Sequence, residues 1–474
     1  MVSQPAESNT TQTFDVKAFG ALGDGQTDDT DALMSAAQAA TQAGGGTIYL
    51  PAGEYCMRFF RAAKFDGVLV TQGCELVGDG PDRTVIRGIA EVADANWNTA
   101  RLIIVQSGTR VAGITFNGVR DEFNRNTFKN YAAILLRTER GASDILVEDC
   151  HFHGQYGNGS REGFGLSIAE SHAVALRRIE AYDNDGSGIS IDGNFDGQRS
   201  HDVTVDDIRV YRNGWQGIAV HVAERVVVTR ASAYENVRHG LNIEWSNDVT
   251  YRDCEAWDNG RRGLRVSGDS RGILWDNVRS RNNGAQFTTG AELILELREF
   301  RLPNREIKNG GRGYPKDVAF KNVTLEPAEG NPQVLLALGD DGEDRASALA
   351  GAGSPRTAAN ASIPASPLAD SFPEFFQGAS FDGTDTTGMN IQTGMSSGRK
   401  RRDGAPGSKA QGGRRQQGAN ASGNATQTPD ANGSRRRGPK QSTPRKRQQP
   451  RPAAGSTSIG KQIQRKIGRL LRGS

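Results

Sequence analysis

The chain has 474 residues, including 59 glycines, and 7% of its residues are aromatic. This composition favours an all-β architecture with many turns over a helical bundle. The net charge of +3 divides unevenly, because residues 399–474 carry 20 Lys and Arg but 2 Asp and Glu, a net of +18 that leaves −15 for the rest. No stretch approaches the roughly 18 apolar residues of a membrane span.

The chain opens with polar residues 1–13, which have neither a basic start nor an apolar core. No secretory signal peptide is therefore expected there. We expect an extracellular or cell-surface location reached by another export route, and the cytoplasm stays open as an alternative. The next segment predicts a strand, a Gly/Asp turn, a helix over 29–42 capped by Thr27 or Asp28, and a first coil that begins with a strand over 47–51.

A repeat of 23 to 29 residues runs through the middle of the chain. Asparagines recur at steps of 29, 23, 23 and 24 residues, and the first four are each followed four residues later by a glycine and then an apolar residue. Short alternating strands separated by Asn/Gly turns are typical of a parallel β-helix, whereas leucine-rich repeats need Leu at fixed positions. The repeated residues are Asn184, Asn213, Asn236, Asn259 and Asn283, with Gly188, Gly217, Gly240 and Gly263.

Equivalent residues of stacked coils should form columns, with neighbours about 4.8 Å apart. An apolar column is expected to fill the core, the asparagines should hydrogen-bond turn backbone from coil to coil, and an aromatic column is interpreted as structural stacking. Cys150 and Cys254 share the apolar column four coils apart, roughly 19 Å at this spacing, so both are predicted to be unpaired thiols. The apolar column is Ile179, Ile208, Ala231, Cys254 and Val278, and the aromatic one is Tyr182, Tyr211, Tyr234 and Trp257.

One strand of each coil should present a polar row to solvent. Side chains at the second and fourth positions after each corner glycine should point outward, because those at the first and third are apolar. The fourth positions then place Asp192, His221 and Glu244 on three adjacent coils. Five further residues are expected to lie near this row and to bind substrate: Arg238, His239, Asn242, Arg262 and Arg265.

Such a row suits proton abstraction from a uronate, because a base removes the C5 proton, an acid completes the reaction and a cation stabilises the charge that develops on the carboxylate. We assign His221 as the acid/base, Asp192 as the group that orients it, and Glu244 as a second base or a calcium ligand. Arg238 and Arg265 would neutralise the substrate carboxylate. Reprotonation from the opposite face would make the protein an epimerase, and expulsion of the 4-linked sugar a lyase.

Three other interpretations stay open for the row. A non-catalytic surface protein, such as a phage-tail-fibre-like adhesin, would use it only to hold a glycan. An inverting glycoside hydrolase would use Asp192 and Glu244, whose spacing of about two coils falls near the range that inversion needs. Polar side chains are also ordinary on any solvated strand face.

Three segments resemble a known family. Residues 14–55 contain AFGALGDG, a DD pair and GGGTIYLPAGEY, residues 235–242 read ENVRHGLN, and Val119-Arg120-Asp121 is similar to an Asn-Arg-Asp element. Together they resemble the pectate-lyase-like superfamily, and residues 14–269 resemble the catalytic module of mannuronan (alginate) C5-epimerases. The resemblance implies a right-handed parallel β-helix that holds a uronan along one sheet, with Arg120 and Asp121 at the substrate.

The chain differs from the epimerases at a motif that has the sequence Tyr-Gly-Phe-Asp-Pro-His in those enzymes. The matching residues run from Ser187 to Asp192, so the Tyr and the first Asp are replaced by Ser187 and Ser190. The His and the further Asp of the next coil have exchanged places, as Asp192 and His221. This departure puts the epimerase activity in question.

The expected domains follow from composition. A parallel β-helix domain is predicted over 14–343, an Ala/Ser/Pro/Gly-rich linker over 344–398, a basic disordered tail over 399–458 and a short basic amphipathic helix over 459–472. The expected partner is an acidic polysaccharide, and the basic tail is expected to contact an anionic surface or partner. Nucleic acid is not favoured, because the tail lacks aromatic residues for base stacking.

Overall fold

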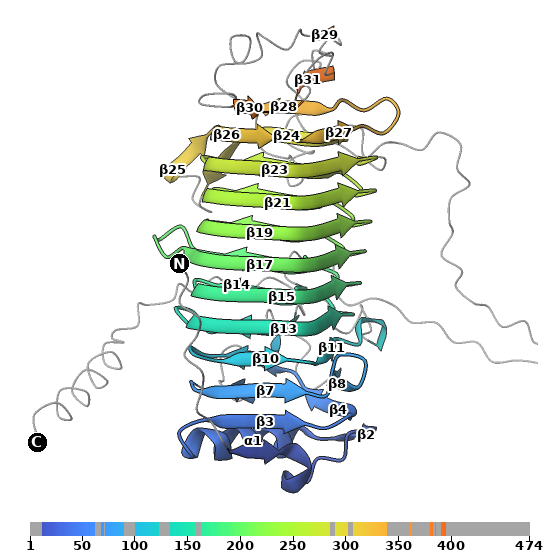
Figure 1. The fold of residues 1–474 in the computed structure, drawn as a ribbon, viewed down its shortest axis with the longest axis vertical. Helices are drawn as coiled ribbons and strands as arrows, with labels where there is room; N and C mark the ends of the chain where they lie inside the picture. Colours follow the sequence, from blue (N-terminus) through green and yellow to red (C-terminus); the bar gives the residue numbers. More distant parts are fainter. Residues whose placement is uncertain are drawn as a thin grey trace, which may run out of the picture. The chain divides into compact units, whose positions relative to one another are not determined.

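The computed structural model describes residues 12–61, 68–70, 72–89, 100–122, 133–157, 163–284, 290–301 and 307–338, with short pieces at 361–362, 380–382, 384 and 390–394. The chain divides into two compact units, Met1–Gly404 and Ala405–Ser474, and every described residue belongs to the first. The tail predicted over 399–458 and the amphipathic helix predicted over 459–472 lie outside the described residues. The helix α1 (Thr30–Gln42), which caps the lower end in Figure 1, does not reach the length and apolar character that crossing a membrane requires, nor does any other helix in the described ranges.

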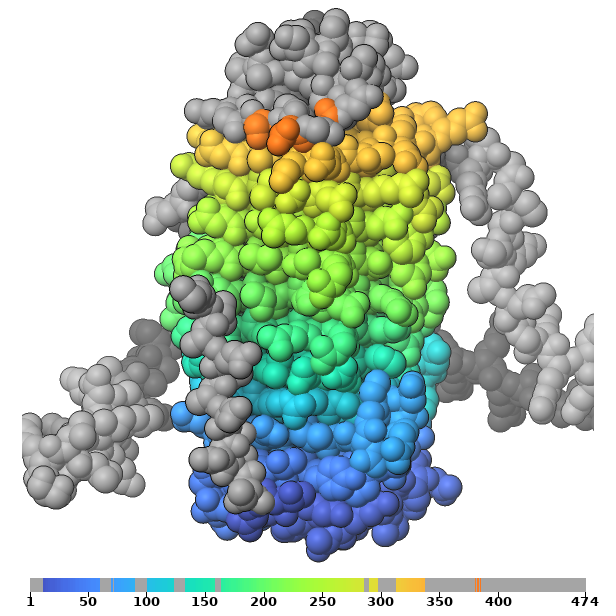
Figure 2. Space-filling model, viewed as in Figure 1, coloured from blue at the N-terminus to red at the C-terminus, as the bar shows by residue number. Residues whose placement is uncertain are grey.

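The chain winds into a right-handed parallel β-helix, whose coils stack from α1 to β30 (Figure 1). Each coil contributes to two ladders of hydrogen-bonded strands, sheet A and sheet B, and in the space-filling view successive coils form coloured bands (Figure 2). The predicted fold class is therefore confirmed.

Sheet A consists of β1 (Thr13–Asp15), β2 (Asp24–Asp28), β3 (Gly46–Leu50), β4 (Gly53–Arg58), β7 (Cys74–Gly78), β8 (Thr84–Ile89), β10 (Arg110–Ala112), β11 (Thr115–Asn117), β13 (Ser143–His153), β15 (His172–Tyr182), β17 (Ser200–Tyr211), β19 (Ala223–Tyr234), β21 (Asn247–Trp257), β23 (Arg271–Arg281), β26 (Lys316–Lys321), β27 (Thr324–Glu326) and β30 (Ser380–Asp382). Sheet B consists of β5 (Phe60–Arg61), β6 (Val68–Val70), β9 (Ala100–Val105), β12 (Ala133–Thr138), β14 (Leu166–Ala169), β16 (Ile189–Asp192), β18 (Ile218–His221), β20 (His239–Glu244), β22 (Arg262–Ser267), β24 (Ala291–Arg301), β25 (Ile307–Gly313), β28 (Val334–Leu338), β29 (Ala361–Ser362) and β31 (Asn390–Gly394). Two short 3-10 helices, η1 (Val16–Phe19) and η2 (Arg120–Glu122), complete the described elements.

The N-terminal helix begins close to where the sequence predicts it. The N-cap is Asp29 and its side chain makes no capping hydrogen bond, so the predicted cap at Thr27 or Asp28 is wrong. The Asp28 side chain, one residue earlier, accepts a hydrogen bond from the Thr30 backbone N–H. Asp29 instead accepts from the backbone N–H groups of Leu22 and Gly23, and so holds the preceding turn against the helix start. The buried face of α1 lies over the core at the end of the stack.

Stacking continues into the segment expected to be a linker. Within 344–398, β30 pairs with β26 and β31 pairs with β28, both in parallel. These described pieces therefore extend the ladders of both sheets beyond residue 343.

The long strands of sheet A bend in the middle, so each covers two faces of the coil. Each bend is a non-glycine residue with a φ between 48° and 58°, in the left-handed region. The bend residues of β13, β15, β17, β19, β21 and β23 are Asp149, Arg178, Asp207, Arg230, Asp253 and Asn277. Asp and Asn tolerate this region better than most residues do, and an arginine takes the same conformation at two of the positions.

Glycine is required at the four corner positions because a larger side chain would not fit, and not because of the backbone conformation. None of the four has a positive φ in the structure. A Cβ at Gly188 or at Gly240 would lie 2.8 Å from the side-chain amide nitrogen of the next coil's asparagine. The tight corner at these glycines therefore depends on the absence of a side chain, which leaves room for the asparagine column, and not on a left-handed backbone.

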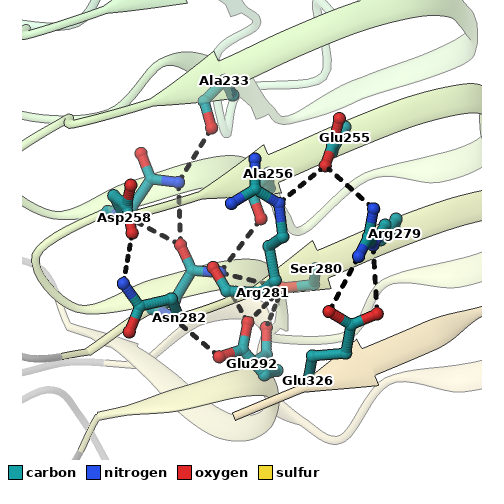
Figure 3. A network of polar contacts seen from close by, with 12 residues as sticks. Ala233, Glu255, Ala256, Asp258, Arg279, Ser280, Arg281, Asn282, Glu292 and Glu326 are labelled. Atoms are coloured by element: carbon teal, nitrogen blue, oxygen red, sulfur yellow. Dashed lines mark hydrogen bonds and ion pairs between the residues drawn. The ribbon is translucent and has the colours of Figure 1, made fainter. Parts of the chain in front are cut away.

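The buried asparagines form a continuous hydrogen-bonded ladder. Asn236 illustrates the pattern, since its Nδ2 donates to Val210 O at 3.1 Å and to Asn259 Oδ1 at 2.9 Å, and its Oδ1 accepts from both nitrogens of Asn213. The ladder ends where Asn283 donates to the buried carboxylate of Glu292. Figure 3 shows this carboxylate, which also accepts from Ser280 Oγ. The predicted coil-to-coil hydrogen bonding is confirmed.

Asn236→Ala is expected to lower the free energy of unfolding by about 2–4 kcal/mol, because the change leaves buried donors and acceptors of two neighbouring coils unsatisfied. Urea unfolding followed by circular dichroism measures this. Thr204→Ala, on the outward face of β17, serves as the control and should stay within about 0.5 kcal/mol of the unmodified chain. Equal losses in the two variants would contradict a special role for the ladder.

The core and corner columns also have their predicted registers. Cys150 pairs with Ile179, Cys254 pairs with Val278, and both cysteines are buried and free. Burial raises the pKa of each thiol to about 12. The aromatic column stacks with ring centroids 4.4–4.9 Å apart, and His153 adds a further ring that the sequence did not single out.

Candidate active site

The predicted polar row lies along sheet B. Asp192 at the end of β16 is in register with His221 at the end of β18, which is in register with Glu244 at the end of β20. His221 Nδ1 lies 3.7 Å from Asp192 Oδ1, an ion-pair distance, and Ser190 Oγ donates to Asp192 Oδ2 at 2.6 Å. The side chains of Asp192 and His221 are each 30% exposed, whereas that of Glu244 is 10% exposed. The pair Asp192–His221 is therefore the accessible part of the row.

Asp192 is a perturbed carboxyl group. Burial raises its pKa above the ordinary value, although the neighbouring His221 and Ser190 oppose the rise. A raised carboxyl pKa beside a histidine is the kind of pairing that active sites use for proton transfer. The geometry thus gives this pair the two groups that an acid/base step requires.

Asp192→Asn is expected to become progressively more stable relative to the unmodified chain as pH rises from 4 to 7.5. A carboxyl whose pKa is raised on folding stabilises the protein at low pH, and this contribution is lost as pH rises through the folded-state pKa. The amide does not titrate, so it avoids that loss. Thermal melting of both proteins across this range measures the difference.

Asp202→Asn is the matched control, because the Arg225 guanidinium holds the pKa of that carboxyl well below its usual range. The variant should be the less stable protein by a nearly constant amount over this range, because the stability that a lowered carboxyl pKa provides is lost only as pH falls below about 4. A pH-independent difference for the Asp192 variant would contradict the perturbed carboxyl.

Arg265 was expected to face solvent and bind substrate, but it is buried. Its side chain is 1% exposed, and both Nε and Nη2 donate to Glu296 Oε2, at 3.0 and 2.6 Å. Nη1 donates to Asn242 Oδ1 at 2.6 Å and lies 3.3 Å from Glu244 Oε2. The guanidinium is thus engaged by two carboxylates and an amide and is not open to a substrate carboxylate in this structure.

The other predicted cations lie at the opposite edge of sheet B. His239 and Arg262 begin the strands that end at the row, so about 16 Å of backbone separates His239 from Glu244 at the usual rise per residue. Both side chains are buried, at 1% and 0% exposure. Arg238 is half-buried and lies over the face of Trp215. These three residues form a basic corner, together with buried Arg261, but they do not join the row.

The two residues suggested by the Asn-Arg-Asp element are likewise separate from the row. Arg120 donates to Asp183 O at 2.7 Å and lies 3.8 Å from Asp185, in the turn between β15 and β16. Asp121 is 94% exposed. Arg120 therefore ties η2 to the asparagine corner.

Sequence reasoning missed Arg137. This half-buried residue lies on β12 in the same outward column as Arg265, and small side chains occupy the coils beside Asp192 and His221. Its charge lowers the pKa of Asp192, which indicates electrostatic proximity. In register, the column reads Arg137, Ser167, Ser190, Ala219, Asn242 and Arg265. Extending the second-position column two coils before Gly188, through Ser167, could have identified it.

Two aromatic residues next to the row were also missed. Phe195 follows β16 and Trp245 follows β20, and their rings pack edge-on against His221. Six extra residues in the first full coil were the available signal for Phe195. Across the described ranges no group of three or more His, Cys, Asp or Glu side chains is arranged to hold a metal ion, and calcium binding stays a prediction.

Comparisons with known proteins agree with the fold. Residues 13–265 match a family model described as rhamnogalacturonase A/epimerase, pectate lyase-like. The A-module of Azotobacter vinelandii mannuronan C-5 epimerase AlgE6 superposes with a TM-score of 0.51 at 21% identity, covering 69% of this chain and 91% of that one. The corresponding module of AlgE4 gives 0.50 at 18% identity, covering 81% and 100%.

Sequence relatives are longer proteins. Alginate lyase 7 of Azotobacter vinelandii is 29% identical over 237 residues, which cover 48% of this chain and 23% of the relative. Mannuronan C5-epimerase AlgE5 of the same organism is 28% identical over 264 residues, or 46% and 26%. The chain thus matches about a quarter of the length of these relatives.

Proposed function

Because the chain belongs to the rhamnogalacturonase A/epimerase, pectate lyase-like family, we propose that it acts on an acidic uronate polysaccharide by abstracting the C5 proton. The observation that carries the proposal is the accessible pair Asp192–His221, with its raised carboxyl pKa, on the outward face of sheet B. The likeness to an alginate lyase and to mannuronan C5-epimerases supports the substrate class.

His221 is the group that exchanges the proton. Asp192 faces Nδ1 of the ring, which leaves Nε2 as the nitrogen that reaches the substrate. His221 takes the C5 proton, and the electrons left on C5 delocalise into the adjacent carboxylate. Charge developing on that carboxylate needs a cation near it. Arg137 takes this role in place of Arg265, since it is half-buried and influences Asp192 electrostatically.

The last step distinguishes two products. In elimination, the C4–O bond breaks, a C4=C5 double bond forms and the departing oxygen takes a proton from the Asp192–His221 pair. In epimerisation, C5 takes a proton from a group on its other face. Asp192 and His221 approach a bound ring from one side, which favours elimination. The epimerases among the sequence relatives favour the alternative.

We assign Glu244 a structural role and no part in the reaction. It is 10% exposed and its carboxylate is held by Arg265. Hydrolysis by Asp192 and Glu244 would need both carboxyl groups free to flank the bond, so this geometry argues against an inverting hydrolase.

Incubation with polymannuronate, alginate and polygalacturonate, with and without calcium, tests the proposal. Absorbance at 232 nm reports the unsaturated ends that elimination creates, and proton NMR reports inverted C5 centres. New unsaturation is the expected result, and inversion without cleavage would make the protein an epimerase. If neither appeared on any uronan, the proposal would be wrong and a glycan-binding β-helix would replace it.

A further inference from the structure

One coil carries an insertion at the end of the strand that bears Asp192. Asp192 is in register with His221 and Ser200 with Ala223, so residues 193–199 stand where the next coil has Val222 alone. The six extra residues account for the 29-residue step between Asn184 and Asn213. We call residues 193–199 the aromatic loop.

The aromatic loop is fixed by its own hydrogen bonds. Asn194 N–H donates to Gln198 O at 2.7 Å, and Asn194 Oδ1 accepts from the backbone N–H groups of Asp196 and Gln198. Arg199 ties the loop to two later coils, since its guanidinium donates to Trp245 O at 2.9 Å and to Ala223 O at 3.4 Å. The loop therefore has one defined position against sheet B.

This position brings Phe195 to the acid/base pair. The Phe195 ring lies 5.5 Å from that of His221 and 5.2 Å from that of Trp245, both edge-on, and His221 lies 5.6 Å from Trp245. Phe195 is half-buried, whereas Trp245 is 7% exposed. Phe195 therefore keeps more surface open beside the row than Trp245 does.

We infer that the aromatic loop provides Phe195 as the apolar side of a subsite that binds one pyranose ring next to His221. A pyranose has apolar C–H faces and a polar rim, and binding sites for such ligands combine aromatic walls with a few placed polar groups. Small residues and Arg137 lie on one side of the row and the aromatic loop on the other. A ring between them directs its carboxylate toward Arg137 and a C–H face toward Phe195. This inference rests on the proposed function for the identity of the sugar.

Phe195→Ala tests the subsite. It is expected to raise KM and the Kd for mannuronate oligomers about tenfold, because an exposed aromatic contact is lost, with a smaller effect on kcat. Phe195→Trp should restore most of the affinity, since it keeps an aromatic face. Isothermal titration measures binding and absorbance at 232 nm, or NMR, measures turnover.

A deletion and a control complete the design. Removing residues 194–199 leaves Gly193 in the place of Val222, which gives a 23-residue coil, and should weaken binding at least as much as Phe195→Ala. Val227→Ala removes an apolar side chain that is 38% exposed on sheet A, away from the row, and should not change binding. Thermal melting of each variant checks that the coils are intact.

The outcomes separate this inference from the proposed function. Unchanged KM and Kd in Phe195→Ala, with turnover still dependent on His221, would overturn the subsite and leave the function standing. Weakened binding by a chain that turns over no uronan would support the subsite and refute the proposed reaction. An unmodified chain that binds no mannuronate oligomer would overturn the inference.

Discussion

His221→Ala is expected to lower kcat on polymannuronate by about a thousandfold while changing Kd by less than threefold. Loss of a positioned general acid or base costs typically 10²–10⁴ in rate. His221 is the histidine of sheet B that lies beside a carboxyl group with a raised pKa, and it is 30% exposed. Binding should persist, because the cation assigned to the carboxylate and the aromatic loop remain.

His201→Ala is the matched control for this variant. His201 is also half-buried and also faces a carboxylate, Asp202, but it lies on sheet A and stacks on His172. Its replacement should leave turnover near that of the unmodified chain. A thousandfold loss in both variants would indicate damage to the fold, and full turnover by His221→Ala would refute the assigned acid/base.

The architecture could be predicted because the stacking of coils in a β-helix requires similar residues at a regular spacing along the sequence. Asn184 and its equivalents are fixed by buried hydrogen bonds between coils, and this requirement imposes a period that single-sequence reasoning can detect. Given this period, strand alternation alone predicts that Asp192 and His221 point outward and that Cys150 points into the core. The register was therefore predictable to the residue.

The exposure of outward side chains could not be predicted in the same way. Arg265 points outward, as alternation requires, yet it is buried because it pairs diagonally with carboxylates on the coils before and after its own. Glu296 lies beyond the regular repeat, after residues 285–289, so spacing gave no reason to align it with Ser267. The repeat fixes which residues are neighbours, but it does not specify which neighbours pair.

The predicted position of Arg238 and His239 beside the row was wrong because the length of a strand separates them from it. Arg238 and His239 adjoin the corner glycine in sequence, and the resemblance drew attention to them. The strand that begins at His239 ends at Glu244, so the polar row lies at the other edge of sheet B. The insertion after Asp192 had no counterpart in the repeat, so the partner of Phe195 could not be deduced. Loops and diagonal pairs are tertiary contacts that a one-dimensional period does not encode.

Arg265→Met is expected to lower the free energy of unfolding by about 3–5 kcal/mol, the usual cost of removing one partner from a buried ion pair. Glu244 and Glu296 would then lie near each other, at 10% and 0% side-chain exposure, without the guanidinium that holds both. Urea unfolding at pH 7 measures the loss.

The double variant Arg265→Met/Glu296→Gln tests the cause. If the cost is the uncompensated buried charge, removing the charge of Glu296 as well should recover part of the stability, so the two changes are not additive. Simple additivity would mean that Arg265 stabilises sheet B through packing alone. Arg279→Met is the control, because its ion pair with Glu326 is about half exposed and should contribute no more than about 1 kcal/mol. The same network holds Glu244 in register with His221 on the next coil, so the pair proposed to react lies beside a carboxylate that is already engaged by Arg265.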